Sequence, residues 1–367
     1  MSELEIAGRV VELVRQLAGP AAQAEVTVTR TELALTRFAN SFIHQNVADS
    51  SVAVRLRMHV DGRTATGGGS LTDPAALREL VEGTMVAARL CPPDPGWPGL
   101  AVAAPVPTGP VYDEATAYAD PDERADRVRA FVDAAGGLET AGYCRTAHRV
   151  AAFANSAGHS AEGRTAEAAM DGVARAGGAD GVARLAVDRL ADLDGAVLGG
   201  RAAAKARAAV DPVELPPGRY EVVFEPAAMA DVLMNLAWYG FNGKMHAERK
   251  SFAELGAAQF DPAVTLVDDP LAGSGLPFDT EGTARGRCHW SPGARPGRWR
   301  STGAPRWRSA ARRPGTAGRV RRRSARSRST SGWSPARGRP RPAARRPGRC
   351  STWTPPRWSP EYAVDCW

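Results

Sequence analysis

The chain has 367 residues, enough for two domains that each bury a core of their own. Its net charge of +7 is unevenly distributed, because residues 286–367 hold 21 Arg, no Lys and two acids, which together give +19. Subtracting this from the total leaves −12 for residues 1–285. The larger part therefore has the charge of an ordinary acidic protein, and the whole basic excess lies after residue 285.

The N-terminal segment and the cysteines argue against several classes of protein. Residues 1–18 place Glu and Arg side chains among the apolar ones, so they form neither a signal sequence nor a membrane-spanning helix. The five cysteines include no C-x-x-C pair, and three of them lie after residue 286. We therefore expect no disulfide framework or zinc ribbon, and we expect a reducing, cytoplasmic location.

The first predicted elements are a helix and a set of strands. Apolar residues at helical spacing predict a helix over residues 3–18. Alternating, β-branched segments predict strands over 24–31 and 51–60. The turn dipeptide Asp61-Gly62 then joins the second strand to another over 63–66, which predicts a tight hairpin.

Two capped helices follow. The first is predicted over residues 75–90 with Asp73 as its cap, and the second over 121–135 with Asp120 as its cap. Between them, residues 92–110 are rich in Pro and Gly, which indicates an irregular connection.

The remaining elements before the basic segment are short strands and two helices. Residues 140–154 read as two short strands and 164–173 as another. An Ala-rich stretch predicts a helix over 192–210. After a group of prolines, 219–224 reads as a short buried strand and 226–239 as a helix.

Together these elements predict an α+β fold of two domains with antiparallel sheets and packed helices, over residues 1–190 and 191–285. Residues 286–367 contain no Ile, Leu, Met or Phe, and their seven Trp follow no helical or strand period. A segment without aliphatic side chains cannot offset its ordering entropy by burial, so the sequence predicts a disordered tail.

Three blocks of sequence, in the same order along the chain, resemble the TldD/PmbA family. The first is FANSFIHQN at residues 38–46, followed by Asp61-Gly62-Arg63. The second is Ala154-Asn155-Ser156-Ala157-Gly158, with Thr165-Ala166-Glu167 after it. The third runs from Glu225-Pro226 to the PFDTEGT segment at 277–283. The resemblance covers residues 1–285.

This resemblance implies a role in a two-subunit cytoplasmic metallopeptidase that trims unfolded peptides and modified peptide precursors. One subunit type carries H-E-x-x-x-H, whose histidines bind zinc and whose glutamate activates water. Here the matching stretch has Met234, Asn235 and Tyr239 at the three functional positions. The departure resembles the PmbA (TldE-like) subunit, so we expect no catalytic or metal-binding residue in this chain, and zinc in a TldD-like partner.

Candidate residues for a peptide groove or a subunit interface remain. His246 and Glu248 either face a peptide or belong to a polar loop, since no second His or Cys lies at ligand spacing. Gly243 and Lys244 either allow a close backbone approach or form the turn after a helix. His44 and Asn46 line an interface or bond to each other at a strand end; the full set is His44, Asn46, Gly243, Lys244, His246 and Glu248.

The basic tail has two interpretations. Its Arg and Trp side chains could contact phosphates and stack on bases, which would make the chain a nucleic-acid-binding protein or a non-enzymatic remnant. Alternatively, Arg, Pro, Ala, Gly, Ser and Trp are the residues that a GC-rich gene gives when it is translated out of frame. We hypothesise a frameshift near codon 285, which would expose apolar surface in the second domain and lower the solubility of the chain.

Overall fold

The computed structural model describes residues 1–109, 112–242, 245–246, 249–254, 257, 259–261, 263–273 and 275–289. The predicted disorder of the tail lies outside these residues. No helix in the described part of the chain is long and apolar enough to cross a bilayer.

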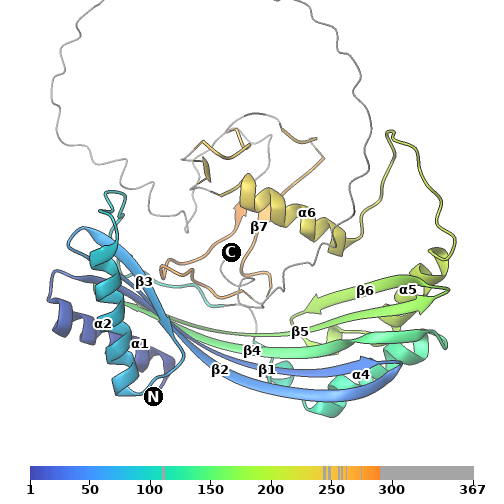
Figure 1. Cartoon of the computed structure of the whole chain (residues 1–367), viewed down its shortest axis with the longest axis horizontal. Helices are drawn as coiled ribbons and strands as arrows, with labels where there is room; N and C mark the ends of the chain where they lie inside the picture. The colour runs from blue at the N-terminus through green and yellow to red at the C-terminus, as the bar shows by residue number, and fades with distance from the viewer. Residues whose placement is uncertain are drawn as a thin grey trace, which may run out of the picture. The chain divides into compact units, whose positions relative to one another are not determined.

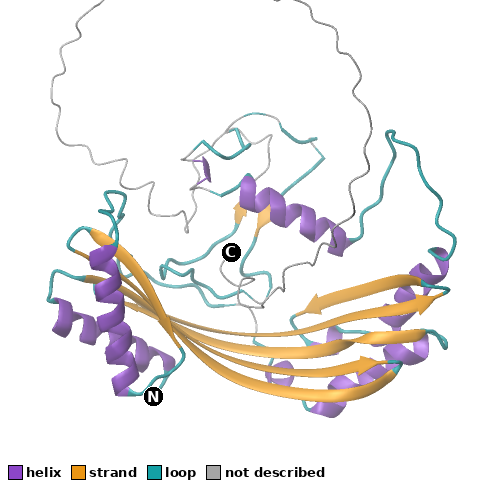
Figure 2. Cartoon of the chain, in the orientation of Figure 1, coloured by secondary structure: helices purple, strands orange, loops and turns teal. Residues whose placement is uncertain are grey.

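A curled antiparallel sheet of six strands, in the order β3-β2-β1-β4-β5-β6, is the main element of the structure (Figures 1 and 2). Four of its strands are 17 or 19 residues long. A strand of this length can contact different helices near its two ends. The strands are β1 (Gln23–Ala39), β2 (Phe42–Val60), β3 (Arg63–Gly69), β4 (Glu139–Asn155), β5 (Ser160–Ala176) and β6 (Ala179–Val187).

The helices lie before, between and after the strands in the sequence. A further pair of two-residue strands, β7 (Val267–Asp268) and β8 (Cys288–His289), is antiparallel. The helices are α1 (Glu3–Ala18), α2 (Pro74–Leu90), α3 (Glu114–Ala117), α4 (Pro121–Ala134), the 3₁₀ turn η1 (Leu190–Asp192), α5 (Gly195–Ala208) and α6 (Pro226–Tyr239).

Most of the predicted elements are confirmed, and with them the α+β class. The side chain of Asp73 accepts hydrogen bonds from the backbone amides of Ala75 and Ala76 at the start of α2. Asp120 forms a capping box with Glu123 at the start of α4. Asp61 and Gly62, both at positive φ, form the turn between β2 and β3.

The prediction of two short strands over residues 140–154 is wrong. The structure has one strand, β4, which pairs with β1 on one side and β5 on the other along most of its length. Gly142 lies within this strand, and a side chain there would place Cβ 2.2 Å from the carbonyl oxygen of Asp171. The glycine therefore permits close strand approach and does not end the strand.

The prediction of a buried strand over residues 219–224 is also wrong. None of these residues lies in a strand, and Val223 is 95% exposed. An apolar, β-branched segment becomes a strand only where another strand can pair with it, and the described part of the chain pairs none with this one.

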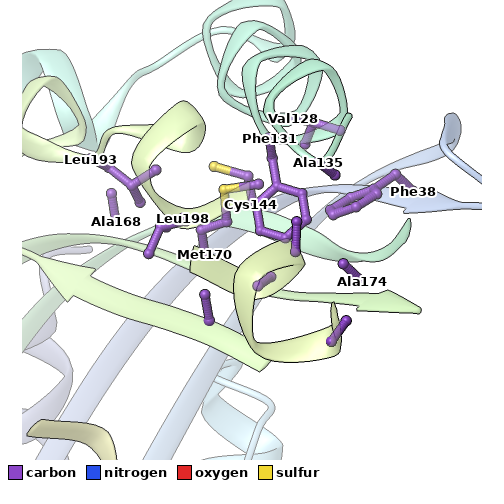
Figure 3. Close-up of a cluster of buried hydrophobic side chains, with 14 of the residues drawn as sticks. Phe38, Val128, Phe131, Ala135, Cys144, Ala168, Met170, Ala174, Leu193 and Leu198 are labelled. Carbon is purple, nitrogen blue, oxygen red and sulfur yellow. The ribbon is translucent and has the colours of Figure 1, made fainter. Parts of the chain in front are cut away.

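One face of the sheet is covered by four helices. At one end of the sheet, α1 packs on Ala24, Val26 and Val28 of β1, and α2 packs on β2 and β3. At the other end, Phe131 of α4 contacts Phe38 of β1, and α5 packs on β5 and β6. Figure 3 shows this second cluster, in which Phe131 of α4 lies among side chains of the sheet and of α5. Helix α5 thus packs on the N-terminal sheet, although the predicted boundary at residue 190 assigns it to a second domain; the domain limits stay a prediction.

Helices α4 and α5 approach each other closely at a glycine. A Cβ atom on Gly199 would lie 2.1 Å from the carbonyl oxygen of Phe131, whereas a Cβ on Gly200 would meet nothing within 4 Å. Backbone atoms cannot move aside as a flexible side chain can, so Gly199 sets the distance between the two helices.

This pair of glycines gives a matched test. We expect Gly199→Ala to lower the free energy of unfolding by about 1–3 kcal/mol, because it overpacks the α4–α5 contact. Gly200→Ala should instead raise it by up to about 1 kcal/mol, because alanine is the better helix former. Urea unfolding of both variants measures the difference, and equal effects would contradict the close packing.

Candidate functional site

The two predicted site residues on β2 lie at an irregularity in the sheet. Arg37 pairs with Gln45 and Phe38 pairs with Ile43, so His44 is the extra residue of a β-bulge and its side chain is exposed. The hydroxyl of buried Thr36 donates a hydrogen bond of 2.6 Å to the side-chain oxygen of Asn46. Asn46 thus bonds across the strand pair to Thr36 rather than to His44.

Of the four candidates after α6, only His246 falls in the described part of the chain. Gly243, Lys244 and Glu248 lie outside it. The backbone amide of His246 donates to the carbonyl oxygen of Asn242 at 3.0 Å. The bonds described for His246 and for Asn46 go to different neighbours, so the structure does not join them into one site.

Helix α6 carries the three positions that correspond to the metal-binding motif. Met234 and Tyr239 are exposed, and the side-chain amide of Asn235 donates to the carbonyl oxygen of Asp231 in the preceding turn. Thioether, carboxamide and phenol groups at these positions do not form a zinc-binding set of imidazoles with a carboxylate base. In the described residues, no three His, Cys, Asp or Glu side chains lie together as a metal site would need.

The most developed polar site is on the other face of the sheet, where residues 276–285 dock against the strands; we call it the docking site. Strand alternation places Glu25 and Arg57 opposite each other on this face. Arg57 contacts the carboxylate of Glu25 at 2.5 Å and that of Glu281 at 3.0 Å. One guanidinium thus connects two adjacent strands with the third block of the sequence.

Two aromatic groups extend the site beside Arg57. The guanidinium lies over the ring of Trp97, 4.8 Å from its centroid, and the ring of His59 is stacked on Trp97 at 4.7 Å. The indole nitrogen of Trp97 donates to the side-chain oxygen of Gln23 at 2.7 Å. The loop after α2 is thereby attached to the first strand.

The loop between β4 and β5 supplies the next part of the docking site. Asn155 is buried, donates to the carbonyl oxygen of Ala101 and accepts from the amides of Ala157 and His159. The buried imidazole of His159 donates from Nε2 to the carbonyl oxygen of Gly282 at 2.6 Å. Blocks two and three of the sequence, 123 residues apart at this bond, meet here.

Apolar contacts complete the attachment. Phe278 is 3% exposed and packs with Ala151, Phe153 and Ala161 of the odd-numbered strand face. Gly282 lies at a φ of +74°, and a Cβ atom there would be 2.3 Å from the ring of Phe153. Glycine is required at this point both for the backbone conformation and for the space.

Asp279 organises the docked segment from within. Its side chain accepts hydrogen bonds of 2.9 Å from the amides of Glu281 and Thr283. Burial raises the pKa of this carboxyl above its ordinary value, although the two amide hydrogen bonds partly oppose the rise. Burial likewise raises the pKa of Asp268 and lowers that of Arg285, which lies near both carboxyls.

Arg57, Asn155 and His159 contact carboxylates, backbone atoms and the ring of Trp97 from distant segments of the chain, so these contacts link the segments of the fold. Sequence reasoning missed the docking site, because Arg57 reads as a solvent-facing residue of an alternating strand. The charge on an otherwise regular strand, together with the Asn155-Ser156-Ala157-Gly158 block, was the available signal.

Gly282 tests the docking site directly. We expect Gly282→Ala to release residues 277–287, because the new Cβ atom would collide with Phe153 and strain the backbone. Cleavage by trypsin after Arg285 and Arg287 should become faster. Gly158→Ala is the control, since Gly158 also has positive φ (+83°) but a Cβ there meets nothing within 4 Å. Equal rates in the two variants would show that steric fit at Gly282 is unimportant.

The raised pKa of Asp279 predicts that the stability of the fold depends on pH. A carboxyl whose pKa is higher in the folded chain stabilises the fold fully below its unfolded pKa of about 4 and loses this effect as pH rises through the folded value. We expect Asp279→Asn to reduce the loss of stability on raising the pH from about 4, measured by urea unfolding.

The matched variant Asp279→Ala removes the acceptor itself. It should cost about 1–3 kcal/mol at all pH values, because the amides of Glu281 and Thr283 lose their partner. A pH profile for Asp279→Asn identical to that of the parent chain would contradict the assignment.

Residues 217–290 match the family model of the PmbA/TldA metallopeptidase C-terminal domain. No curated protein matches the sequence.

Three solved structures share the fold at 18% sequence identity. TldE from Thermococcus kodakarensis superposes with a TM-score of 0.64, covering 82% of this chain and 70% of that one. A proposed modulator of a DNA gyrase from Thermotoga maritima gives 0.65, with 79% and 69% covered. A second proposed gyrase modulator, from Bacteroides thetaiotaomicron, gives 0.67, with 79% and 70% covered. The family match over residues 217–290 and the fold shared with these structures together support a TldD/PmbA-family protein.

Proposed function

We propose that this chain is the PmbA/TldE-like subunit of a two-subunit cytoplasmic metallopeptidase that processes peptides or modified peptide precursors. The zinc ion of that enzyme belongs to a TldD-like partner subunit. The supporting observation is helix α6, which lies in the family-matched region yet has Met234, Asn235 and Tyr239 where a zinc-binding subunit has His, Glu and His.

The chemistry of those three side chains argues for a supporting role. Zinc hydrolysis needs imidazole ligands to hold the ion and a carboxylate to remove a proton from the bound water. Neither a thioether nor a carboxamide is a base of the required strength, and the Asn235 amide bonds to its own helix. The likeness to TldE at the level of fold supports the same subunit type.

A peptide has two places to bind on this sheet. The strand order makes β3 and β6 the edge strands, and an extended peptide can add to an edge through main-chain hydrogen bonds. His44, at the bulge of β2, stays a candidate interface residue. The nucleic-acid alternative rests on the basic tail alone, since residues 1–285 carry a net charge of −12 and would repel phosphates.

The proposal predicts how zinc and activity divide between the subunits. Purified alone, this chain should bind no stoichiometric zinc and should not hydrolyse an unfolded peptide. Co-expressed with a homologue that carries H-E-x-x-x-H, it should co-purify with it and give a peptidase that loses activity on removal of zinc. Metal analysis and peptide cleavage measure both.

Two controls sharpen this test. Replacing the Glu of the partner's motif by Gln should abolish hydrolysis while leaving the complex intact, and Asn235→Ala in this chain should leave hydrolysis unchanged. Zinc-dependent cleavage by this chain without any partner would overturn the assignment.

A further inference from the structure

We propose that the exposed apolar surface of residues 213–239 is the binding surface for a polypeptide segment that the same gene encodes in a neighbouring reading frame. The change of frame lies between codons 281 and 290. The occupant is thus the chain's own continuation, one nucleotide out of phase with the sequence from about residue 286 onward. Three observations lead to this inference: the apolar surface, the coding pattern of the tail, and the position of β8.

The apolar surface combines the segment 213–224 with helix α6. Val223 is 95% exposed, Leu215 64% and Phe224 53%. Helix α6 buries none of its residues, although most of them are apolar, and Trp238 is 49% exposed. A helix composed mostly of apolar residues normally lies inside a protein, and exposed apolar residues in this number mark a surface that another segment covers.

The coding pattern is visible in the amino acids themselves. Eight residue types, namely Ala, Arg, Cys, Gly, Pro, Ser, Thr and Trp, are the ones whose codons have G or C as second base. Residues 286–360 consist of these eight types at all but two of 75 positions, the exceptions being His289 and Val320. In the preceding 75 residues, 211–285, only 34 belong to them.

This excess of G and C at the second base shows which base of each codon is free to vary in the frame that selection maintains. In a GC-rich gene, G and C accumulate at the third codon position, because changes there seldom alter the protein. A second-base column filled with G and C is therefore the third-base column of the frame under selection. Each codon of that frame consists of the last base of one visible codon and the first two bases of the next.

This assignment fixes the chemistry of the occupant. A visible Trp or Cys codon begins with TG, so the codon in the other frame ends in TG and encodes Leu, Met or Val. A Ser codon that begins with TC gives Phe, Leu, Ile or Val by the same rule. The scattered Trp, Cys and Ser residues of the tail thus correspond to apolar residues in the other frame. Such residues would pack against the apolar surface of residues 213–239.

The positive charge of the tail disappears in the same frame. A visible Arg codon that begins with CG gives a codon ending in CG, which encodes Ser, Pro, Thr or Ala. The segment 286–360 also lacks Asp, Glu, Asn and Lys, so only Arg or Ser codons that begin with AG could produce a stop codon there. The alternative frame is expected to be open and to encode a segment of ordinary composition.

Strand β8 marks the place in the fold at which the proposed segment would begin. Cys288 and His289 pair with Val267 and Asp268 as the last described residues. In the other frame, the codons at Cys288, His289 and Trp290 encode an apolar residue, a small residue and an apolar residue. This alternation continues a strand from the point at which β8 begins.

The test is a one-nucleotide restoration. Because the visible codons start one base after those of the proposed frame, inserting a single nucleotide between codons 282 and 287 restores it. Inserting two nucleotides at the same place gives the third frame and is the matched control. Trypsin cleavage after exposed Arg219, followed by mass spectrometry, reports whether the apolar surface is covered.

We expect cleavage after Arg219 to slow by about tenfold or more in the one-nucleotide product, because the site becomes accessible only through local opening. The two-nucleotide product should be cleaved as fast as the original chain. Equal protection in both products would overturn the proposal, and so would a stop codon in the restored frame before the position of Pro360.

Two further results decide against the inference. If Arg219 is already protected in the original chain and sedimentation shows a dimer, a second copy occupies the surface. If the restored protein is less soluble than the original chain, the encoded segment does not cover the surface. Hydrogen exchange of the β4 amides, which lie far from the insertion in sequence, confirms that each product has folded.

Discussion

A sheet of long strands has two faces, and each apolar face must be covered for the chain to fold. In the N-terminal part of this protein, one face of the sheet receives α1 and α2 at one end and α4 and α5 at the other. The odd-numbered face receives residues 276–285, which return from far along the sequence. Both coverings depend on glycines that allow close contact, Gly199 between two helices and Gly282 against Phe153.

The docking site explains how a distant segment can be held in register. Phe278 supplies apolar burial, while Arg57 and His159 bond to Glu281 and to the Gly282 carbonyl. A partly buried cation between two carboxylates contributes chiefly specificity, because desolvation offsets much of its Coulomb energy. Phe278 is buried against the sheet, and Arg57 and His159 fix the position of the segment that carries it.

The need to cover apolar surface is not met between residues 213 and 239 in the described part of the chain. Segment 219–224 has the composition of a buried strand and α6 that of a buried helix, yet both are exposed among the described residues. The coding pattern after residue 285 is the basis of our proposal that their cover is encoded in another reading frame. A single change of frame would account for both the basic tail and the exposed helix.

Sequence reasoning succeeded where local physics decides the structure. The caps at Asp73 and Asp120 and the Asp61-Gly62 turn depend on neighbouring residues, so their patterns are readable. It failed where long-range contact decides. Residues 140–154 are predicted as two short strands but form one strand between β1 and β5, and 219–224 is predicted as a strand but has no strand partner among the described residues. The docking site was missed for the same reason, because the 224-residue separation of Arg57 and Glu281 leaves no local pattern.

The central claim is that residues 1–209 and the docked segment form a complete fold, whereas residues 213–239 lack their cover. Native-state hydrogen exchange of the unaltered chain tests it most directly. The account predicts that amides in the middle of β1 and β4 exchange only on global unfolding, while those of α6 exchange through local opening at far lower free energy. Protection of the α6 amides equal to that of β4 would contradict it.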